Sequence, residues 1–150
     1  MRIFWLEHVH NIVYEKWMRL KNAQTFVFWT KPIAKGRPRV GRNGAIYTPK
    51  TTTDFEKNIR ECIWQNYQCL YGPLHLVIEF HFKRGAHVPK KKLWRCAKPD
   101  LDNLAKSVFD AANGLLFEDD KQIVSLQVSK MYDIEDKIIL RIAQIEHENE

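Results

Sequence analysis

The segment Leu74–Lys83, LHLVIEFHFK, alternates apolar and polar side chains without a break. Because successive side chains of a β-strand point to opposite faces, this alternation predicts a strand that is buried on one face only. The face expected to be buried holds Leu74, Leu76, Ile78, Phe80 and Phe82. A chain that contains such a strand must build a sheet and cover one side of it.

The opposite face of the same strand aligns His75, Glu79 and His81. These three side chains could bind a metal ion, since imidazole and carboxylate are both metal ligands. The more ordinary interpretation is a polar sheet face that lines or supports a site elsewhere. The sequence leaves both interpretations open.

The remaining segments predict three helices and three further strands. Helical spacing of apolar residues occurs over residues 3–20, over 53–70, and from a start within 100–102 to residue 112. Strand patterns occur over residues 25–30, 122–131 and 137–145, and we expect the last two to form a closing hairpin. The predicted fold is of the α/β type, more narrowly α+β: a small mixed sheet with helices packed on it, in a single domain. Residues 1–24 would be an appended amphipathic helix, 25–146 the domain itself, and 147–150 a frayed tail.

The predicted helix over residues 53–70 makes specific demands on its ends and its buried side. Thr51, Thr52 or Thr53 is expected to cap its start, and the Gly72-Pro73 pair to stop it. Its buried stripe would hold Phe55, Ile59, Cys62 and Ile63, followed by Asn66 or Tyr67.

Length and composition exclude several classes of protein. A chain of 150 residues suggests one domain with a real core, and no apolar run reaches the roughly 18 residues that a membrane helix needs. The N-terminus lacks the pattern of a secretory signal. Three cysteines without C-x-x-C spacing give neither a zinc signature nor a disulfide framework, so the cytoplasm is the expected location.

Charge is distributed unevenly along the chain. Residues 1–99 carry a net charge of +13, whereas residues 100–150 carry −7. A basic region followed by an acidic cluster indicates a protein that binds a polyanion beside a metal or catalytic centre. The alternative is a scatter of charges that folding mixes again.

Two basic segments are candidates for contact with a nucleic acid. Residues 31–49 form a glycine- and proline-rich loop or irregular hairpin, and residues 83–98 form a second basic segment that includes a tryptophan. Arginine and lysine on such segments suit phosphate oxygens, although a solvated basic loop would look the same. The residues expected to contact nucleic-acid phosphates are Lys35, Arg37, Arg39, Arg42, Lys90, Lys91, Lys92, Arg95 and Lys98.

Residues 98–120, KPDLDNLAKSVFDAANGLLFEDD, concentrate six carboxylates in a basic chain. Asp100 and Asp102 stand at a predicted helix start, where two side chains one residue apart can converge, and Asp120 follows at the next strand. Mg²⁺ prefers one or two carboxylates with waters and phosphate, so these acids form a candidate metal site. Lys106 shares a helix face with Asp102 and could offset charge on a bound phosphate. A surface ion-pair ladder is the alternative for this face and the preferred one for Asp110.

The same residues resemble the RusA-type Holliday junction resolvases. The resemblance rests on the run Asp100-Leu101-Asp102-Asn103-Leu104 with Lys106, on Asp119-Asp120, and on Gln122-Ile123-Val124 followed by Lys130. Upstream, residues 35–39 and 47–49 are similar to a basic loop of phage-borne members. The resemblance covers about residues 25–146.

This resemblance implies a homodimer that uses Mg²⁺, for which Mn²⁺ may substitute, to cut four-way DNA junctions. Carried over to this chain, it makes Asp100, Asp102 and Asp120 the essential acids and metal ligands, Asp119 a secondary ligand, and Lys106 a catalytic residue. Lys130 joins the set expected to contact DNA. We therefore predict a resolvase that acts by symmetric phosphodiester hydrolysis. The alternatives are a nuclease for flaps or forks and a non-catalytic DNA-binding or regulatory protein.

Overall fold

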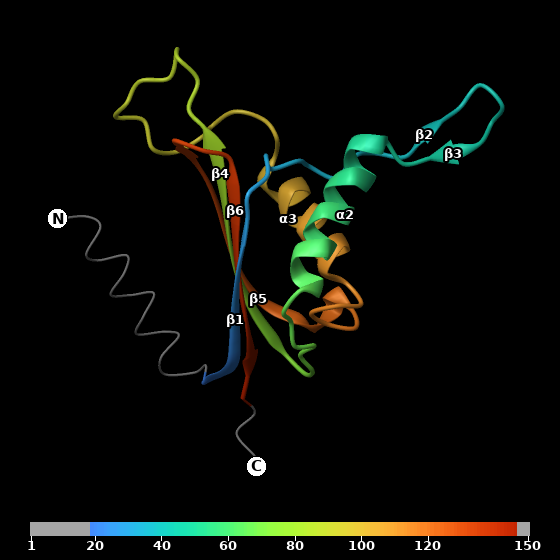
Figure 1. Ribbon diagram of the computed structural model, residues 1–150, viewed down its shortest axis with the longest axis vertical. Helices are drawn as coiled ribbons and strands as arrows, with labels where there is room; N and C mark the ends of the chain where they lie inside the picture. Colours follow the sequence, from blue (N-terminus) through green and yellow to red (C-terminus); the bar gives the residue numbers. More distant parts are fainter. Residues whose placement is uncertain (1–18, 147–150) are drawn as a thin grey trace.

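The computed structural model describes residues 19–146, in which two helices pack against one face of a four-stranded mixed sheet (Figure 1). The sheet contains β1 (Leu20–Phe28), β4 (Leu74–Lys83), β5 (Ile123–Asp133) and β6 (Lys137–Ile145), in the spatial order β1-β6-β4-β5. β4 and β5 run parallel, joined through helix α3, and the other neighbours run antiparallel. The α+β prediction is confirmed.

β4 lies between β5 and β6 and has the boundaries that its alternation predicts. Its five apolar side chains of the predicted inner face are all at most 3% exposed. They meet the buried stripes of α2 (Lys50–Trp64) and α3 (Leu101–Ala112), which form the other half of the core.

Helix α3 also follows its prediction closely. Asp100 is its N-cap residue, so the helix begins within the predicted three residues. It ends at Ala112, just before Gly114, whose φ of +76° is a conformation that glycine adopts without strain.

The predicted hairpin of the last two strands is wrong. β5 and β6 are joined by the short turn of residues 134–136, but β4 lies between them and pairs with both. The physical reason is β4 itself: its buried apolar face requires a central position, and the turn crosses over its end. There the main-chain N–H of Lys83 donates to Oδ1 of Asp136, at 2.8 Å, and holds the turn in place.

The first strand starts earlier than predicted, at Leu20, and ends at Phe28 instead of residue 30. The first residues of β1 do not alternate between buried and exposed side chains, so the sequence pattern misses them. They pair with the end of β6, from Leu20 opposite Ile145 onward. The pairing slips between Lys21 and Gln24, around Asn22 with its positive φ of 53°.

Helix α2 is displaced toward the N-terminus relative to its prediction. It runs from Lys50 to Trp64, six residues short of the predicted end, so Asn66 and Tyr67 lie beyond it and are exposed. No threonine caps it; the buried Thr52 hydroxyl instead accepts from the N–H of Gly36, at 3.3 Å. Cys62 is exposed, so its predicted place in the core is wrong. The buried stripe is narrower than predicted and holds Thr52, Phe55, Ile59 and Ile63.

Residues 31–49 contain the irregular hairpin that their glycines and prolines predict, with the short strands β2 (Arg39–Val40) and β3 (Ile46–Tyr47). The predicted helix over residues 3–20, apart from its last two residues, and the predicted tail over 147–150 lie outside the described residues. Within the described residues, no helix has the length and apolar content needed to cross a bilayer.

Candidate active site

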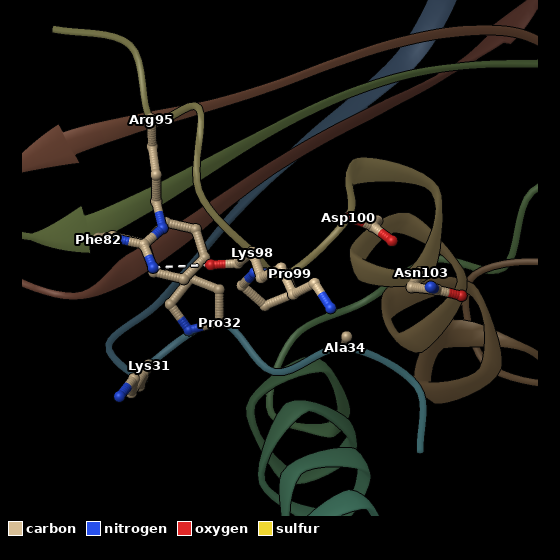
Figure 2. Close-up of a pocket in the computed structure, with 9 residues that line it drawn as sticks. All are labelled: Lys31, Pro32, Ala34, Phe82, Arg95, Lys98, Pro99, Asp100 and Asn103. Carbon is tan, nitrogen blue, oxygen red and sulfur yellow. Dashed lines mark hydrogen bonds between the residues drawn. The ribbon is translucent and has the colours of Figure 1, made fainter. Parts of the chain in front are cut away.

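A pocket of about 470 Å³ opens beside the start of α3 (Figure 2). Four parts of the chain form it: the segment after β1, the end of β4, the loop between β4 and α3, and the first turn of α3 itself. Its lining consists of Lys31, Pro32, Ala34, Phe82, Arg95, Lys98, Pro99, Asp100 and Asn103. The pocket therefore combines cationic side chains with one of the predicted catalytic acids. Lys31 and Asn103 were not among the predicted site residues, and their place here depends on the fold.

Asp100 and Asp102 are both exposed at the N-terminus of α3. Asp100 is the N-cap residue, yet its side chain makes no capping hydrogen bond. Within residues 19–146 neither carboxylate takes part in an ion pair. Two unengaged carboxylates at one helix start fit what Mg²⁺ usually takes from a protein, one or two oxygen ligands with the rest supplied by water and phosphate.

Lys106 lies one turn after Asp102 and is exposed. Within the described part of the chain its ammonium forms no ion pair, so the alternative of an ion-pair ladder along this helix face is not made. Asp110 pairs instead with Lys35, whose Nζ lies 2.8 Å from Oδ2 of Asp110. Lys106 therefore remains available to a ligand beside Asp102.

Asp119 and Asp120 stand at the short 3-10 helix η1 (Asp120–Gln122). Asp119 is its N-cap: Oδ1 accepts from the N–H of Lys121, at 2.9 Å, and the Gln122 side chain bonds back in a capping box. This backbone hydrogen bond lowers the pKa of the Asp119 carboxyl. Asp119 thus has a structural task, whereas Asp120 is exposed.

The structure does not bring Asp120 to Asp100 and Asp102 within one chain. The segment that holds Asp120 lies beyond the C-terminal end of α3, at the opposite end of the sheet from the start of that helix (Figure 1). On β5, Ile123 follows η1 directly, whereas Lys130 binds the carbonyl of Pro99. The strand advances seven residues from Ile123 to Lys130, which is about 23 Å. Within residues 19–146, no three His, Cys, Asp or Glu side chains are grouped so that they could hold a metal ion. The metal ligands remain a prediction.

Two cations hold the main chain immediately before Asp100. Lys130 Nζ donates to the carbonyls of Ala97, at 2.8 Å, and Pro99, at 2.7 Å. Arg95 Nη2 donates to the carbonyl between them, that of Lys98, at 2.7 Å. All three carbonyls that precede Asp100 are thus held by positive charge, and the approach of the chain to α3 is fixed.

Arg95 is also stacked over the sheet. Its guanidinium lies 4.5 Å from the centre of the Phe82 ring, and Figure 2 shows the two side chains together at the pocket. At the other end of the same loop, Arg84 donates to the carbonyls of Pro89 and Lys92, at 2.6 and 2.7 Å. Arg95 was predicted to contact DNA, whereas Arg84 was not; a lysine or arginine that holds a loop has the same sequence signature as one that holds a phosphate.

Lys35 is a third predicted DNA contact that the structure uses internally. Its ammonium lies 2.7 Å from Glu56 of α2 and 2.8 Å from Asp110 of α3, and so joins the two helices. Partial burial acts to lower the pKa of Lys35, but the hydrogen bonds and charges of Asp110 and Glu56 outweigh it, and the pKa is raised.

The other predicted DNA contacts are exposed and stand on both sides of the pocket. The basic hairpin and the loop after β4 project at the same end of the molecule, where α3 begins (Figure 1). The exposed cations are Arg37, Arg39, Arg42, Lys90, Lys91, Lys92 and Lys98. This arrangement places positive charge around Asp100 and Asp102.

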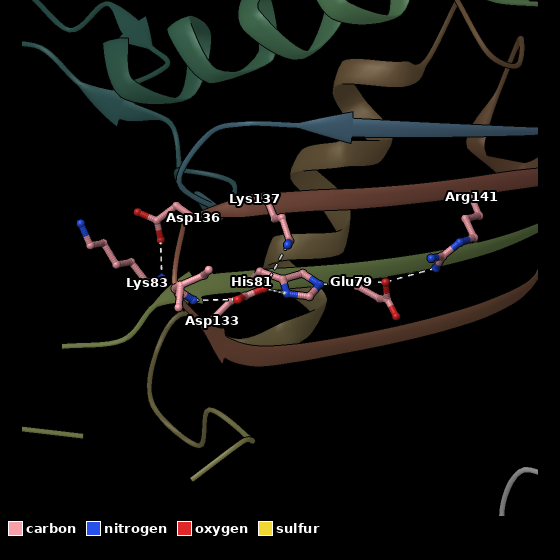
Figure 3. A network of polar contacts seen from close by, with 8 residues as sticks. Glu79, His81, Lys83, Asp133, Asp136, Lys137 and Arg141 are labelled. Carbon is pink, nitrogen blue, oxygen red and sulfur yellow. Dashed lines mark hydrogen bonds and ion pairs between the residues drawn. The ribbon is translucent and has the colours of Figure 1, made fainter. Parts of the chain in front are cut away.

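The polar face of β4 does not form the alternative metal set. His75 Nδ1 lies 2.8 Å from the Ser125 hydroxyl, and Arg141 donates to Glu79, at 3.1 Å. His81 Nδ1 lies 2.7 Å from Asp133, which also pairs with Lys137 (Figure 3). His81 Nε2 also lies 3.9 Å from Oε2 of Glu79, but the shorter contacts of the three side chains go to different partners, as expected for a polar sheet face. The N–H of Ile134, then Lys137, lowers the pKa of Asp133 to about 2.

Comparisons with known proteins identify the family of the chain. The profile of the family described as Endodeoxyribonuclease RusA matches residues 30–143. The chain is 31% identical over 135 residues to the uncharacterized protein YqaN of Bacillus subtilis (strain 168), covering 80% of this chain and 95% of that protein. It is 34% identical over 89 residues to the crossover junction endodeoxyribonuclease rusA of Lactococcus phage r1t, covering 57% of this chain and 62% of the phage protein.

Proposed function

Because the chain belongs to the RusA endodeoxyribonuclease family, we propose that it is a Mg²⁺-dependent enzyme that resolves Holliday junctions by symmetric phosphodiester hydrolysis. The observation that supports this most directly is the pair of exposed, unengaged carboxylates at the start of α3, surrounded by exposed cations. Its setting would be recombination and repair of DNA in the cytoplasm.

In this proposal Asp100 and Asp102 hold the metal ion through their carboxylate oxygens, and Mn²⁺ can take the place of Mg²⁺. A bound divalent ion supplies an activated water and neutralises charge on the scissile phosphate. Lys106 lies one turn from Asp102 and offsets the negative charge that develops on the phosphate oxygens. Lys130 and Arg95 keep Asp100 in place through the carbonyls before it.

A homodimer gives Asp120 a role that a single chain does not allow. Mg²⁺ binds oxygen at about 2.1 Å, and strand β5 alone places about 23 Å between the main-chain positions near Asp120 and near Asp100. We therefore assign Asp120 to the site of the second protomer, with Asp119 as its support at the cap of η1. A two-fold dimer then presents two sites to a junction that has the same symmetry.

The exposed cations on either side of the pocket would hold the junction arms through their phosphates. Each phosphate contact releases counterions, so the affinity should fall steeply as salt rises. Lys35, Arg95 and Lys130 are assigned to the protein's own structure in this proposal, because their charged groups already bind protein oxygens.

The test is cleavage of a synthetic four-way junction by wild type and by Asp100→Asn and Asp102→Asn. Each variant should bind the junction as wild type does in EDTA but fail to cut it with Mg²⁺. Asp54→Asn, which changes an exposed aspartate on α2, is the matched control and should cut normally. Efficient cutting of flaps or forks with intact four-way junctions would replace the resolvase by a nuclease for other branched DNA. Binding without any metal-dependent cutting by wild type would indicate a regulatory DNA-binding protein.

A further inference from the structure

The hairpin of β2 and β3 projects away from the sheet and helices as an arm (Figure 1). Its ladder is short, with Arg39 opposite Tyr47 and Val40 opposite Ile46. A tight turn closes it, in which the N–H of Gly41 donates to the carbonyl of Ala45, at 2.8 Å. Gly44 adopts a φ of +77° in this turn.

The two faces of this hairpin differ in chemistry. Residues directly opposite each other in an antiparallel pair share a face, and neighbours along a strand alternate. One face therefore carries Val40 and Ile46, which are 71% and 75% exposed. The other carries Arg39 and Tyr47, the latter 50% exposed. Two large apolar side chains held side by side in water indicate a surface that binds something.

Charge identifies the kind of partner. Residues 36–49 contain three arginines and no acidic residue. A second copy of the chain would bring another net charge of +6 against this arm, which disfavours self-association through it. A partner that combines negative charge with a flat apolar surface fits both faces, and DNA whose base stack is open at one end has this combination.

The arm is anchored beside the candidate active site. At its base, the N–H of Lys35 donates to the carbonyl of Asn103, one residue after Asp102, at 3.1 Å. The Lys35 ammonium ties the same point to Asp110 further along α3. Gly36 lies so close to Thr52 that a Cβ there would come within 2.6 Å of the Thr52 hydroxyl oxygen. DNA bound at Asp100 and Asp102 would thus lie next to a firmly held arm.

We propose that Val40 and Ile46 pack against the end of the base stack that is exposed at the branch point of the DNA, while Arg39 on the other face contacts a phosphate. This inference rests on the proposed function, because it takes branched DNA as the substrate. In a continuous duplex both faces of each base pair are covered by neighbours, whereas a branch point can expose one. The arm would therefore favour branched over linear DNA without reading sequence.

The test compares Val40→Ser/Ile46→Ser with Arg39→Gln and with Ile134→Ser, a control that removes an apolar side chain 83% exposed in the turn after β5. Binding is measured in EDTA on a four-way junction and on a linear duplex of the same length. The junction carries 2-aminopurine at the exposed end of the base stack, where its fluorescence changes with the surroundings of the base when side chains cover it. The single variant Ile46→Thr, which keeps a β-branched side chain in the strand, accompanies the double variant.

The double variant should bind the junction about tenfold more weakly while its affinity for the duplex is unchanged, since two partly exposed apolar side chains lose their contact. It should also lose the change in 2-aminopurine fluorescence that wild type produces on binding, and Ile46→Thr should lose part of that change. Arg39→Gln should lower the affinity for the junction and for the duplex alike, and should lower the slope of log affinity against log salt concentration by about one. Ile134→Ser should behave as wild type.

Junction affinity and fluorescence that match wild type in the double variant would overturn the proposal. A change in oligomeric state on size exclusion with light scattering would also overturn it, because the apolar face would then cover a second copy. These readouts need no cutting. If wild type fails to cut while the junction preference depends on Val40 and Ile46, the proposed catalytic function fails and the role of the arm stands.

Discussion

The sharpest prediction concerns how two inactive variants combine. Asp100→Asn and Asp120→Asn should each abolish cutting as homodimers, because each removes a proposed ligand from both sites. If Asp120 serves the site of the other protomer, a heterodimer with one copy of each variant has both substitutions in one site and none in the other. It should therefore nick a junction at about half the wild-type rate, with one of two sites intact.

The expected half rate of the heterodimer follows from the distance between Asp120 and Asp100 within one chain. Between Ile123, next to Asp120, and Lys130, which binds the carbonyl before Asp100, β5 alone extends about 23 Å. Carboxylate side chains reach only a few ångströms from the main chain, whereas Mg²⁺ binds oxygen at about 2.1 Å. If the two residues did serve one site within a chain, the same heterodimer would have both sites damaged, and its rate should equal that of the inactive homodimers.

The assay uses co-expressed chains with two different affinity tags, so that sequential purification isolates the heterodimer. Nicking of a junction labelled on each strand is followed with Mg²⁺ present. A heterodimer of Asp100→Asn with Asp102→Asn is the matched negative control: these acids belong to the same protomer's contribution, so both sites are damaged. Activity of Asp100→Asn with Asp120→Asn no higher than this control would refute the shared site. Wild-type activity of the Asp120→Asn homodimer would remove Asp120 from the metal ligands.

Three further predictions follow from individual contacts. Lys130→Met should lower kcat on junctions by about tenfold or more with unchanged affinity in EDTA, because two carbonyls before Asp100 lose their donor. Lys130→Arg should restore part of kcat. Reduced affinity with normal kcat would instead make Lys130 a DNA contact. Lys35→Met should lower the free energy of unfolding in urea by about 1–2 kcal/mol, since Glu56 and Asp110 lose their shared cation at a half-buried position; an unchanged midpoint would contradict this. The pKa of Asp133 is lowered from 3.8 to about 2 in the folded protein. The ionised carboxylate therefore adds to the free energy of unfolding above pH 3.8, and this contribution disappears as the pH falls toward 2. Its side chain is 25% exposed, so we expect the wild type to lose about 1 kcal/mol more than Asp133→Asn over this interval in denaturant titrations.

Local patterns in the sequence predict the parts of this fold that depend on local forces. The alternation over β4 and the proline, apolar spacing and glycine around α3 fix those two elements, and the structure agrees with them. The order of strands depends instead on which apolar faces find each other after collapse. A short turn between β5 and β6 predicts a hairpin, but the burial demanded by β4 places that strand between them.

The candidate site shows the same division. Placing Asp100 and Asp102 at the start of a helix required only local sequence, and the structure bears this out. Which cations face solvent did not follow from sequence, since Lys35, Arg95 and Lys130 bind oxygens that only the folded chain brings near. The separation of Asp120 from Asp100 was also not readable, because 20 residues of helix, turn and loop can return to their start or travel away from it.

The strand order has a consequence for how the chain reaches this fold. Within the described residues, β6 is the strand that joins β1 to the rest of the sheet, and it is the last strand of the chain. Every pairing in the four-stranded sheet is long-range in sequence, and β1 pairs with residues more than 100 positions away. Such topologies fold slowly, because long loops must close before any pair of strands can form. During synthesis, β1 and the edge of β4 that pairs with β6 would remain unpaired until β6 emerges. A chain truncated before Lys137 would therefore be an aggregation-prone fragment.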